Sequence, residues 1–165
     1  MTLLARLAVA EPVETWPGMR QAAETRFWDG LALAAGESDH AAGAVYLLGY
    51  VAEMLLKTAY FRFVGVPPGE NLAPHLRAVR AHAAWTGRNL HDLRSWVDFL
   101  VDVRRLQGQP LPPAFAGQAR VQTLAVDVHW RESLRYTSLP ALDLELSQVY
   151  DGVEWLRLNH TALWS

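Results

Sequence analysis

The sequence contains no cysteine, only one lysine and no long apolar run that is free of charge. Because there is no cysteine, the chain can form neither disulfides nor thiolate metal sites, and its composition suits a reducing cytoplasm. The segment 41–64 is long enough to span a bilayer, but Glu53, Lys57 and Arg62 interrupt it. We therefore expect a cytoplasmic protein that does not enter a membrane.

An excess of charge of one sign is missing as well. Fifteen basic and 17 acidic residues give a net charge of −2, and both signs are spread evenly along the chain. Counting therefore reveals no large basic face for duplex nucleic acid, although arginines can still cluster in space.

Several motifs that mark enzymes and metal sites are also missing. The six histidines include no H-E-x-x-H pair and no pattern of neighbouring carboxylates, so we expect neither a metal site nor a metal cofactor. The chain has no G-x-S-x-G, Walker or G-x-G-x-x-G pattern. Triad hydrolases and P-loop or Rossmann nucleotide sites therefore have no support, and we expect no cofactor.

Apolar residues recur with the helical period along most of the chain, and proline and glycine separate the periodic segments. No segment shows the period-two alternation of a half-buried strand, so a sheet is not expected. Helices are predicted over residues 19–35, 39–64, 74–85, 90–106, 114–130 and 141–163. We therefore predict an all-α, up-down bundle of five to six helices, forming one domain over 19–165 after an N-terminal arm over 1–18.

The only lysine, Lys57, lies four residues after Glu53 in the most apolar predicted helix. Residues four apart share a helix face, so the two side chains can form an ion pair. Burying two charges is unfavourable unless they pair closely and their hydrogen bonds are satisfied. The pair is thus either at the rim with apolar stems buried, or a polar site inside the core. With Tyr46 and Tyr50 it forms a polar stripe along the helix.

Arg77 and His82 are separated by four residues in the segment R-A-V-R-A-H. An arginine and a histidine can together cleave a phosphodiester, since the histidine moves a proton while the guanidinium stabilises charge on the phosphate. Residues five apart, however, point to different faces of a helix. A chain this rich in arginine and histidine also produces such a spacing by chance, so the pair is a weak catalytic candidate.

The segment W-R-E-S-L-R-Y, residues 130–136, lies where a predicted helix ends. Arginine with tryptophan and tyrosine can bind a phosphate and stack on a base, which makes Trp130, Arg131, Arg135 and Tyr136 ligand-binding candidates. The structural alternative is that Trp130 belongs to the core, Tyr136 closes the bundle and the arginines bond carbonyls at the helix end.

His91 and Asp92 open the predicted helix over 90–106. A carboxylate is favoured at the positive end of the helix dipole, so Asp92 suits this position. His91 is expected to cap the helix or to pack against the preceding loop. Both residues therefore have a structural use beside their use as ligand-binding candidates.

Three pieces of the chain, taken in order, match a pattern known from one helical family. AGAVYLLGYVAEMLLK (42–57) contains G-Y-x-x-E-x-x-x-K, NLHDLRSWVDFL (89–100) contains H-D-L at a helix start, and WRESLRY (130–136) reads W-x4-R-Y. These pieces resemble the HEPN domain, a helical bundle found with nucleotidyltransferases and in RNA-targeting defence systems. The first is similar to the long second helix of the family, and the others to features of one prokaryotic subgroup. The similarity covers about residues 20–160.

This resemblance implies a four- or five-helix bundle that is frequently a homodimer. Many HEPN members are metal-independent endoribonucleases that use an R-x4-6-H motif near the dimer cleft. Others lack the motif and serve as nucleotide-binding or non-catalytic modules. Some members pair with a small nucleotidyltransferase as a toxin–antitoxin system, which makes such an enzyme a candidate partner here.

The chain departs from this pattern where the motif is expected. The position after the H-D-L helix offers Arg131 and, five residues on, Tyr136 in place of histidine. A tyrosine of ordinary pKa is a poor general base near neutral pH. Arg77 and His82 have the right spacing, but they precede the H-D-L helix.

Three interpretations remain open. The first is a dimeric module that binds a nucleotide, an RNA or a partner protein. The second is a ribonuclease toxin that uses an arginine with His82, His91 or His129. The third is a helical scaffold whose polar stripe only fixes the packing. The ligand-binding candidates of the first are Glu53, Lys57, His91, Asp92, Trp130, Arg131, Arg135 and Tyr136.

Overall fold

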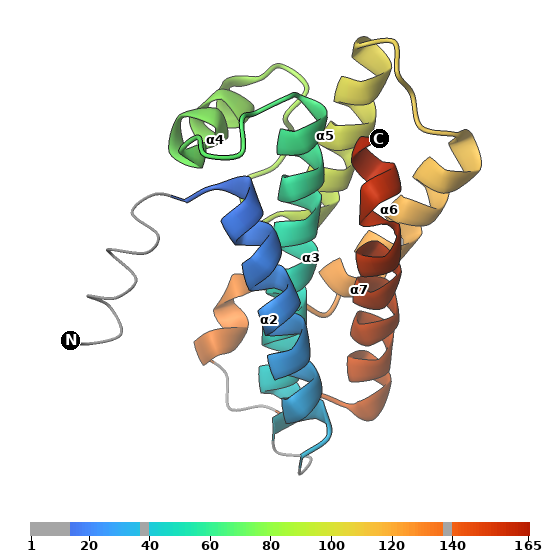
Figure 1. The fold of residues 1–165 in the computed structure, drawn as a ribbon. Helices are drawn as coiled ribbons and strands as arrows, with labels where there is room; N and C mark the ends of the chain where they lie inside the picture. Colours follow the sequence, from blue (N-terminus) through green and yellow to red (C-terminus); the bar gives the residue numbers. More distant parts are fainter. Residues whose placement is uncertain (1–13, 37–39, 137–139) are drawn as a thin grey trace, which may run out of the picture.

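The computed structural model describes residues 14–36, 40–136 and 140–165, and of Arg135 and Tyr136 only the backbone. Throughout this part the chain forms helices and loops, without strands, as predicted (Figure 1). The α-helices are α2 (Trp16–Ala34), α3 (Ala41–Phe63), α4 (Leu72–Ala81), α5 (Leu93–Leu106), α6 (Pro113–Asp127) and α7 (Asp143–Trp164), and a short 3-10 helix, η2 (Glu132–Tyr136), precedes α7.

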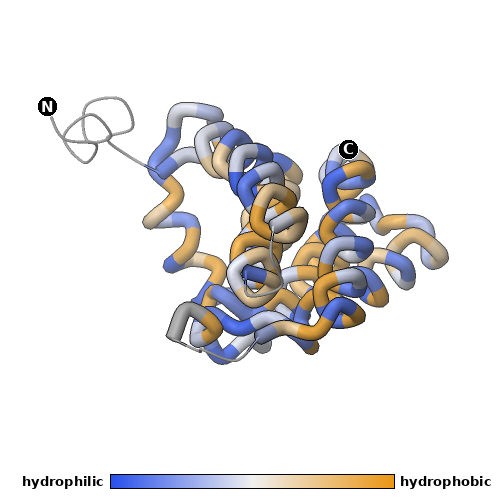
Figure 2. Tube along the Cα trace, turned by 90° about the horizontal axis from the view of Figure 1, so that it is seen from below, coloured by the Kyte–Doolittle hydropathy of each residue, from blue (hydrophilic) through white to orange (hydrophobic). Residues whose placement is uncertain are grey.

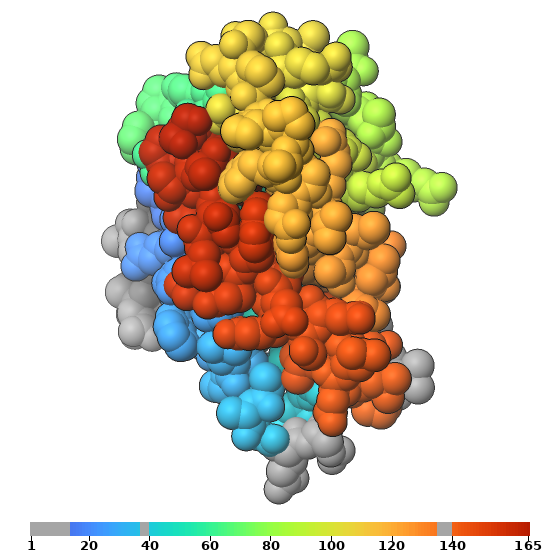
Figure 3. Space-filling view, turned by 90° about the vertical axis from the view of Figure 1, so that its right-hand side faces the viewer, coloured from blue at the N-terminus to red at the C-terminus, as the bar shows by residue number. Residues whose placement is uncertain are grey.

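The helix α3 is the centre of the bundle. It packs against α2, α7 and α5, and also touches η2 and α6 (Figure 1). Its buried positions lie on all sides, from Ala41 at its start to Phe61 near its end. Protein therefore nearly surrounds this helix. On the face shown in Figure 3, α7 runs between α2 and α6.

The other helices each have buried and exposed positions, as expected for a layer around a central helix. Figure 2 looks at the bundle from below and shows hydrophobic and hydrophilic positions interleaved along the helices. Within the described residues, no helix has both the length and the apolar character needed to cross a bilayer. The charges of Glu53, Lys57 and Arg62 are what lower the hydropathy of α3.

Most helix boundaries differ from the sequence prediction by a few residues, and one short element was not predicted. The helix α2 begins at Trp16 rather than at residue 19, because the Thr15 hydroxyl caps it and proline occupies its first turn. The arm is therefore shorter than predicted, and its residues 1–13 lie outside the described part of the chain. The helix α4 ends at Ala81 because His82 adopts an extended conformation. The 3-10 helix η2 was not predicted.

Two arginines close one end of the bundle. Arg104 of α5 is buried and donates to the carbonyls of Leu163 and Ser165, at 3.1 and 3.0 Å. These carbonyls lie at the end of α7, where a helix leaves acceptors without intrahelical partners. Arg62 of α3 stacks its guanidinium 3.5 Å from the centroid of the Trp164 ring. The C-terminus is thus attached to both α3 and α5.

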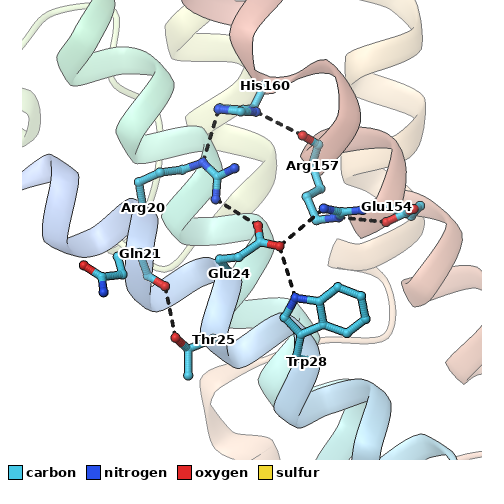
Figure 4. A network of polar contacts seen from close by, with 8 residues as sticks. All are labelled: Arg20, Gln21, Glu24, Thr25, Trp28, Glu154, Arg157 and His160. Carbon is cyan, nitrogen blue, oxygen red and sulfur yellow. Dashed lines mark hydrogen bonds and ion pairs between the residues drawn. The ribbon is translucent and has the colours of Figure 1, made fainter.

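A polar network joins α2 to α7 (Figure 4). Arg157 bonds Glu154 on its own helix at 3.0 Å and reaches Glu24 of α2 at 3.4 Å. Arg20 of α2 donates through Nε to His160 Nε2 at 3.2 Å, so His160 Nδ1 donates to the Arg157 carbonyl. The network holds the first half of α2, which forms one wall of the cavity described below.

Gly49 is required where α3 meets Trp130. A Cβ on Gly49 would lie 2.0 Å from the Trp130 ring, whereas a Cβ on the exposed Gly117 of α6 would meet nothing within 4 Å. We expect Gly49→Ala to lower the free energy of unfolding by about 1–3 kcal/mol or more, because the ring must move. Gly117→Ala should raise it by about 0.5–1 kcal/mol. Chemical denaturation would measure both, and equal effects would contradict this packing.

Candidate functional site

Glu53 and Lys57 form a buried ion pair on successive turns of α3. Lys57 Nζ lies 2.6 Å from Glu53 Oε1, and the two side chains are 8% and 5% exposed. The ammonium also lies 5.6 Å from the centroid of the Trp96 ring, a cation–π contact with α5. The pair is therefore a polar site inside the protein and not a pair at its rim.

His91 is the third member of this site. Its Nδ1 lies 2.9 Å from Glu53 Oε2, so each oxygen of the carboxylate has a nitrogen partner. Its Nε2 lies 3.6 Å from Glu132 Oε2, beyond a hydrogen bond but within ion-pair range. The hydrogen bond to Glu53 raises the pKa of His91, against the opposing effects of burial and of Lys57.

Tyr50 of α3 contacts the imidazole, and Trp130, which lies between α6 and η2, packs behind Tyr50. Tyr50 meets both His91 and Trp130 edge to face, with centroid distances of 6.3 and 5.3 Å. Trp130 is buried and donates to the Tyr46 carbonyl at 3.1 Å. Burial, a hydrogen bond with Tyr46 and two nearby carboxylates raise the pKa of Tyr50. Its hydroxyl therefore stays protonated and is no base near neutral pH.

The polar site opens on a cavity of about 740 Å³ between α2 and α3, which we call the α2–α3 cavity. Met19 and Ala22 of α2 line one side, and Tyr50, Glu53, Met54 and Lys57 of α3 line the other. Leu76 of α4 and Leu90 complete the apolar lining. The volume is in the range of small-molecule sites.

A second hollow of about 390 Å³, here the arginine hollow, lies on the other side of His91. His91 lines both spaces and is the residue they share. The arginine hollow is lined by Arg88, Arg94, Arg131, Asn89, His91, Asp92, Asp127 and Glu132.

The carboxylates that line the arginine hollow already have partners in the protein. Asp92 caps α5 by accepting from the Ser95 amide at 2.9 Å. Asp127 lies 3.3 Å from Arg131 and accepts from the backbone N–H of Arg94, while burial raises its pKa. Among the described side chains, the guanidinium groups of Arg88 and Arg94 form no ion pair, and both residues are exposed. They are available to an anion.

Arg131 bonds carbonyls near the end of a helix, as the structural alternative of the sequence analysis proposed for it. It donates to the carbonyls of Asp127 and Trp130 at the end of α6, the second at 2.6 Å, and still lines the arginine hollow. Trp130 lies in the core, as in the structural alternative. The backbone of Arg135 and Tyr136 lies in η2, and their side chains lie outside the described residues.

The predicted residues divide into two groups. The structure brings together Glu53, Lys57, His91, Asp92 and Arg131 around the two spaces. It places the weak catalytic pair elsewhere, since Arg77 is exposed on α4 and lines neither space. His82 ends that helix, where its Nδ1 accepts from the Ala84 amide at 3.1 Å and its ring packs on Phe99.

Sequence reasoning missed Arg88, Arg94 and Glu132. Each lies beside or within a segment that was singled out, around H-D-L or after Trp130. The signal was therefore present as proximity in sequence, but only the fold shows that these segments meet.

No group of three or more metal-ligating side chains was found among the described residues. Comparisons of the chain with protein-family models, curated proteins and solved structures gave no match.

Replacing Lys57 by methionine should destabilise the protein, because Glu53 then loses its closest counter-charge. Removing one partner of a buried pair costs about 3–5 kcal/mol, and water in the adjoining cavity should bring the value to the lower end. The double variant Glu53→Gln/Lys57→Met should recover at least about 1 kcal/mol relative to the sum of the single variants. Urea unfolding of the four proteins measures this coupling, and additive effects would contradict a mutual pairing.

His91 and His160 should affect stability with opposite dependence on pH. The pKa of His91 is raised above its ordinary value of 6.5, so its contribution is complete below that pH and is lost as the pH rises. The pKa of His160 is lowered, mainly by burial, so its contribution is present above pH 6.5 and is lost on acidification.

Comparing each histidine-to-glutamine variant with the parent protein from pH 5 to pH 9 tests these signs. For His91, which is partly exposed, we expect a difference of up to about 1 kcal/mol at the acidic end, declining toward the basic end. For His160 the difference should grow toward the basic end. Parallel profiles for the two variants would contradict the hydrogen-bond assignments.

Proposed function

We propose that this chain is a HEPN-like helical module that binds a nucleotide or RNA around His91, in a defence or toxin–antitoxin context. One observation carries the proposal. The buried pair of Glu53 and Lys57 opens on a cavity, and His91, bonded to that pair, also lines a second hollow. In that hollow Arg88 and Arg94 form no ion pair with any described side chain. The site thus combines a partly open space of mixed polar and apolar lining with groups suited to phosphate.

The arginines support a phosphate-bearing ligand. A guanidinium offers five donors in a planar fork that matches the oxygens of a phosphate. Arg88 and Arg94 lie on the same hollow without ion pairs among the described residues, while the carboxylates beside them are held by Arg131, His91 and backbone amides. An anion can therefore bind there without first breaking an ion pair of Arg88 or Arg94.

The cavity argues against a scaffold without a ligand. The low exposure of Glu53 and Lys57 is compatible with a pair that only fixes the packing of the helices. Such a pair would need no cavity beside it. Both side chains, however, line a cavity of about 740 Å³. The homodimer and the nucleotidyltransferase partner rest on the family resemblance, and a partner protein remains the other ligand class. The cytoplasmic setting rests on the absence of cysteine.

A ribonuclease is the second candidate, because one observation favours His91 for proton transfer. Glu53 binds Nδ1 of His91 and thereby orients the ring, which leaves Nε2 on the side of the arginine hollow. In this alternative His91 would move a proton while an arginine stabilises charge on the phosphate. The raised pKa of His91 suits a group that donates a proton near neutral pH.

A charge-matched pair of double variants tests the binding function. Arg88→Gln/Arg94→Gln removes the two hollow arginines, and Arg77→Gln/Arg80→Gln removes two exposed arginines of α4. Fluorescence anisotropy with a labelled single-stranded RNA should show at least about a tenfold loss of affinity, or about 1.4 kcal/mol, for the first variant only. An equal loss in both variants would mean that net charge, and not this hollow, attracts RNA.

The same RNA distinguishes the two candidate functions. If the protein is a ribonuclease that uses His91, His91→Gln should abolish cleavage on a gel, whereas His82→Gln and His129→Gln should retain it. If RNA binds and stays intact with the parent protein, the binding function stands and the ribonuclease is excluded for that substrate.

A further inference from the structure

We infer that the ligand is a nucleoside phosphate that spans both spaces, with its phosphate in the arginine hollow and its base in the α2–α3 cavity. This inference rests on the proposed function and adds the ligand class and its direction. The two spaces share His91, so a ligand that occupies both must pass that ring. Each space has chemistry that suits only one end of such a molecule.

The α2–α3 cavity suits a base. Lys57 has three N–H donors, and among the described residues only Glu53 accepts from it, at 2.6 Å. Its remaining donors can meet ring nitrogens or carbonyl oxygens, which every nucleobase presents. Met19 and Met54 line the same space, and thioether sulfur makes favourable contacts with aromatic rings. Burial of a flat ring between them would exclude water from the ion pair.

The same cavity does not suit a phosphate. Glu14 and Glu53 both line it, and the positive charge of Lys57 is already neutralised at 2.6 Å by Glu53. A phosphate placed here would face two carboxylates, and like charges at short distance repel each other. The base is therefore the end of the ligand that enters.

The arginine hollow differs from the cavity, because it adds guanidinium groups and each of its three carboxylates already has a partner in the protein. Arg88 and Arg94 are exposed and make no ion pair among the described side chains, whereas Asp127 is bound by Arg131 and by the backbone N–H of Arg94. His91, whose Nδ1 is held by Glu53, presents its other nitrogen on this side. The guanidinium donors of Arg88 and Arg94 therefore suit the oxygens of a phosphate. His91 lies where the hollow meets the α2–α3 cavity.

Titration calorimetry on the full chain tests the division. The probes are the nucleoside 5′-monophosphates, adenosine, ribose 5-phosphate and inorganic phosphate. At least one nucleotide should bind about tenfold or more tighter than ribose 5-phosphate and than adenosine. Arg88→Gln/Arg94→Gln should weaken every phosphate ligand to a similar extent and leave adenosine unchanged.

A filled cavity provides the second arm. Ala22 is exposed on α2 yet lines the cavity, so Ala22→Phe should fold and occupy the base site, and Thr25→Phe, one turn further on, is its matched control. Only Ala22→Phe should reduce nucleotide affinity to that of ribose 5-phosphate, without changing phosphate affinity. Circular dichroism would verify that both variants fold.

The outcomes separate this inference from the proposed function. If RNA binding depends on Arg88 and Arg94 but no mononucleotide binds, or Ala22→Phe has no effect on nucleotide affinity, the ligand does not span both spaces and the RNA-binding function stands. If neither RNA nor any phosphate ligand binds, both are overturned.

Discussion

The carboxylate of Glu53 is the charge on which the interior depends. It is almost fully buried, and an unpaired carboxylate there would be very unfavourable. One oxygen is met by Lys57 of the same helix and the other by His91, 38 residues further along the chain. The hydrogen bond between Glu53 and His91 therefore fixes the loop before α5 against α3. It also places the His91 ring next to Glu132 of η2. Helix packing alone would not specify that register.

Much of the helical architecture could be predicted from sequence, because its signals are local. The helical period in α3, proline and glycine between segments, and Asp92 at the start of α5 each act within a few residues. The predicted helix boundaries were wrong where a local contact decided the end of the helix. Thr15 caps α2 earlier than predicted, and the extended conformation of His82 ends α4 at Ala81. The 3-10 helix η2 has no comparable periodic signal, since one short turn shows no repeat.

The candidate site was predictable only in its local half. Glu53 and Lys57 follow from their spacing on one helix, but the bond to His91 and the shared lining of two spaces depend on tertiary packing. Arg77 and His82 line neither space, which agrees with their spacing, because residues five apart point to different faces of a helix. Arg131 shows a different limit, since it holds the end of α6 and lines the arginine hollow at once. Its structural and binding roles were treated as alternatives, and geometry permits both.

His91 gives the two spaces a common electrostatic control. When the imidazole is protonated, Glu53 holds it on one side and Glu132 lies near it on the other, so its charge is matched before any ligand arrives. An anion in the arginine hollow would add a further negative neighbour and favour the charged ring. Because the His91 ring meets one oxygen of Glu53, Lys57 needs to donate only to the other oxygen. The remaining N–H groups of Lys57 can then donate into the α2–α3 cavity. Under the proposed function, occupation of one space would therefore bear on the hydrogen bonds available in the other through this single side chain.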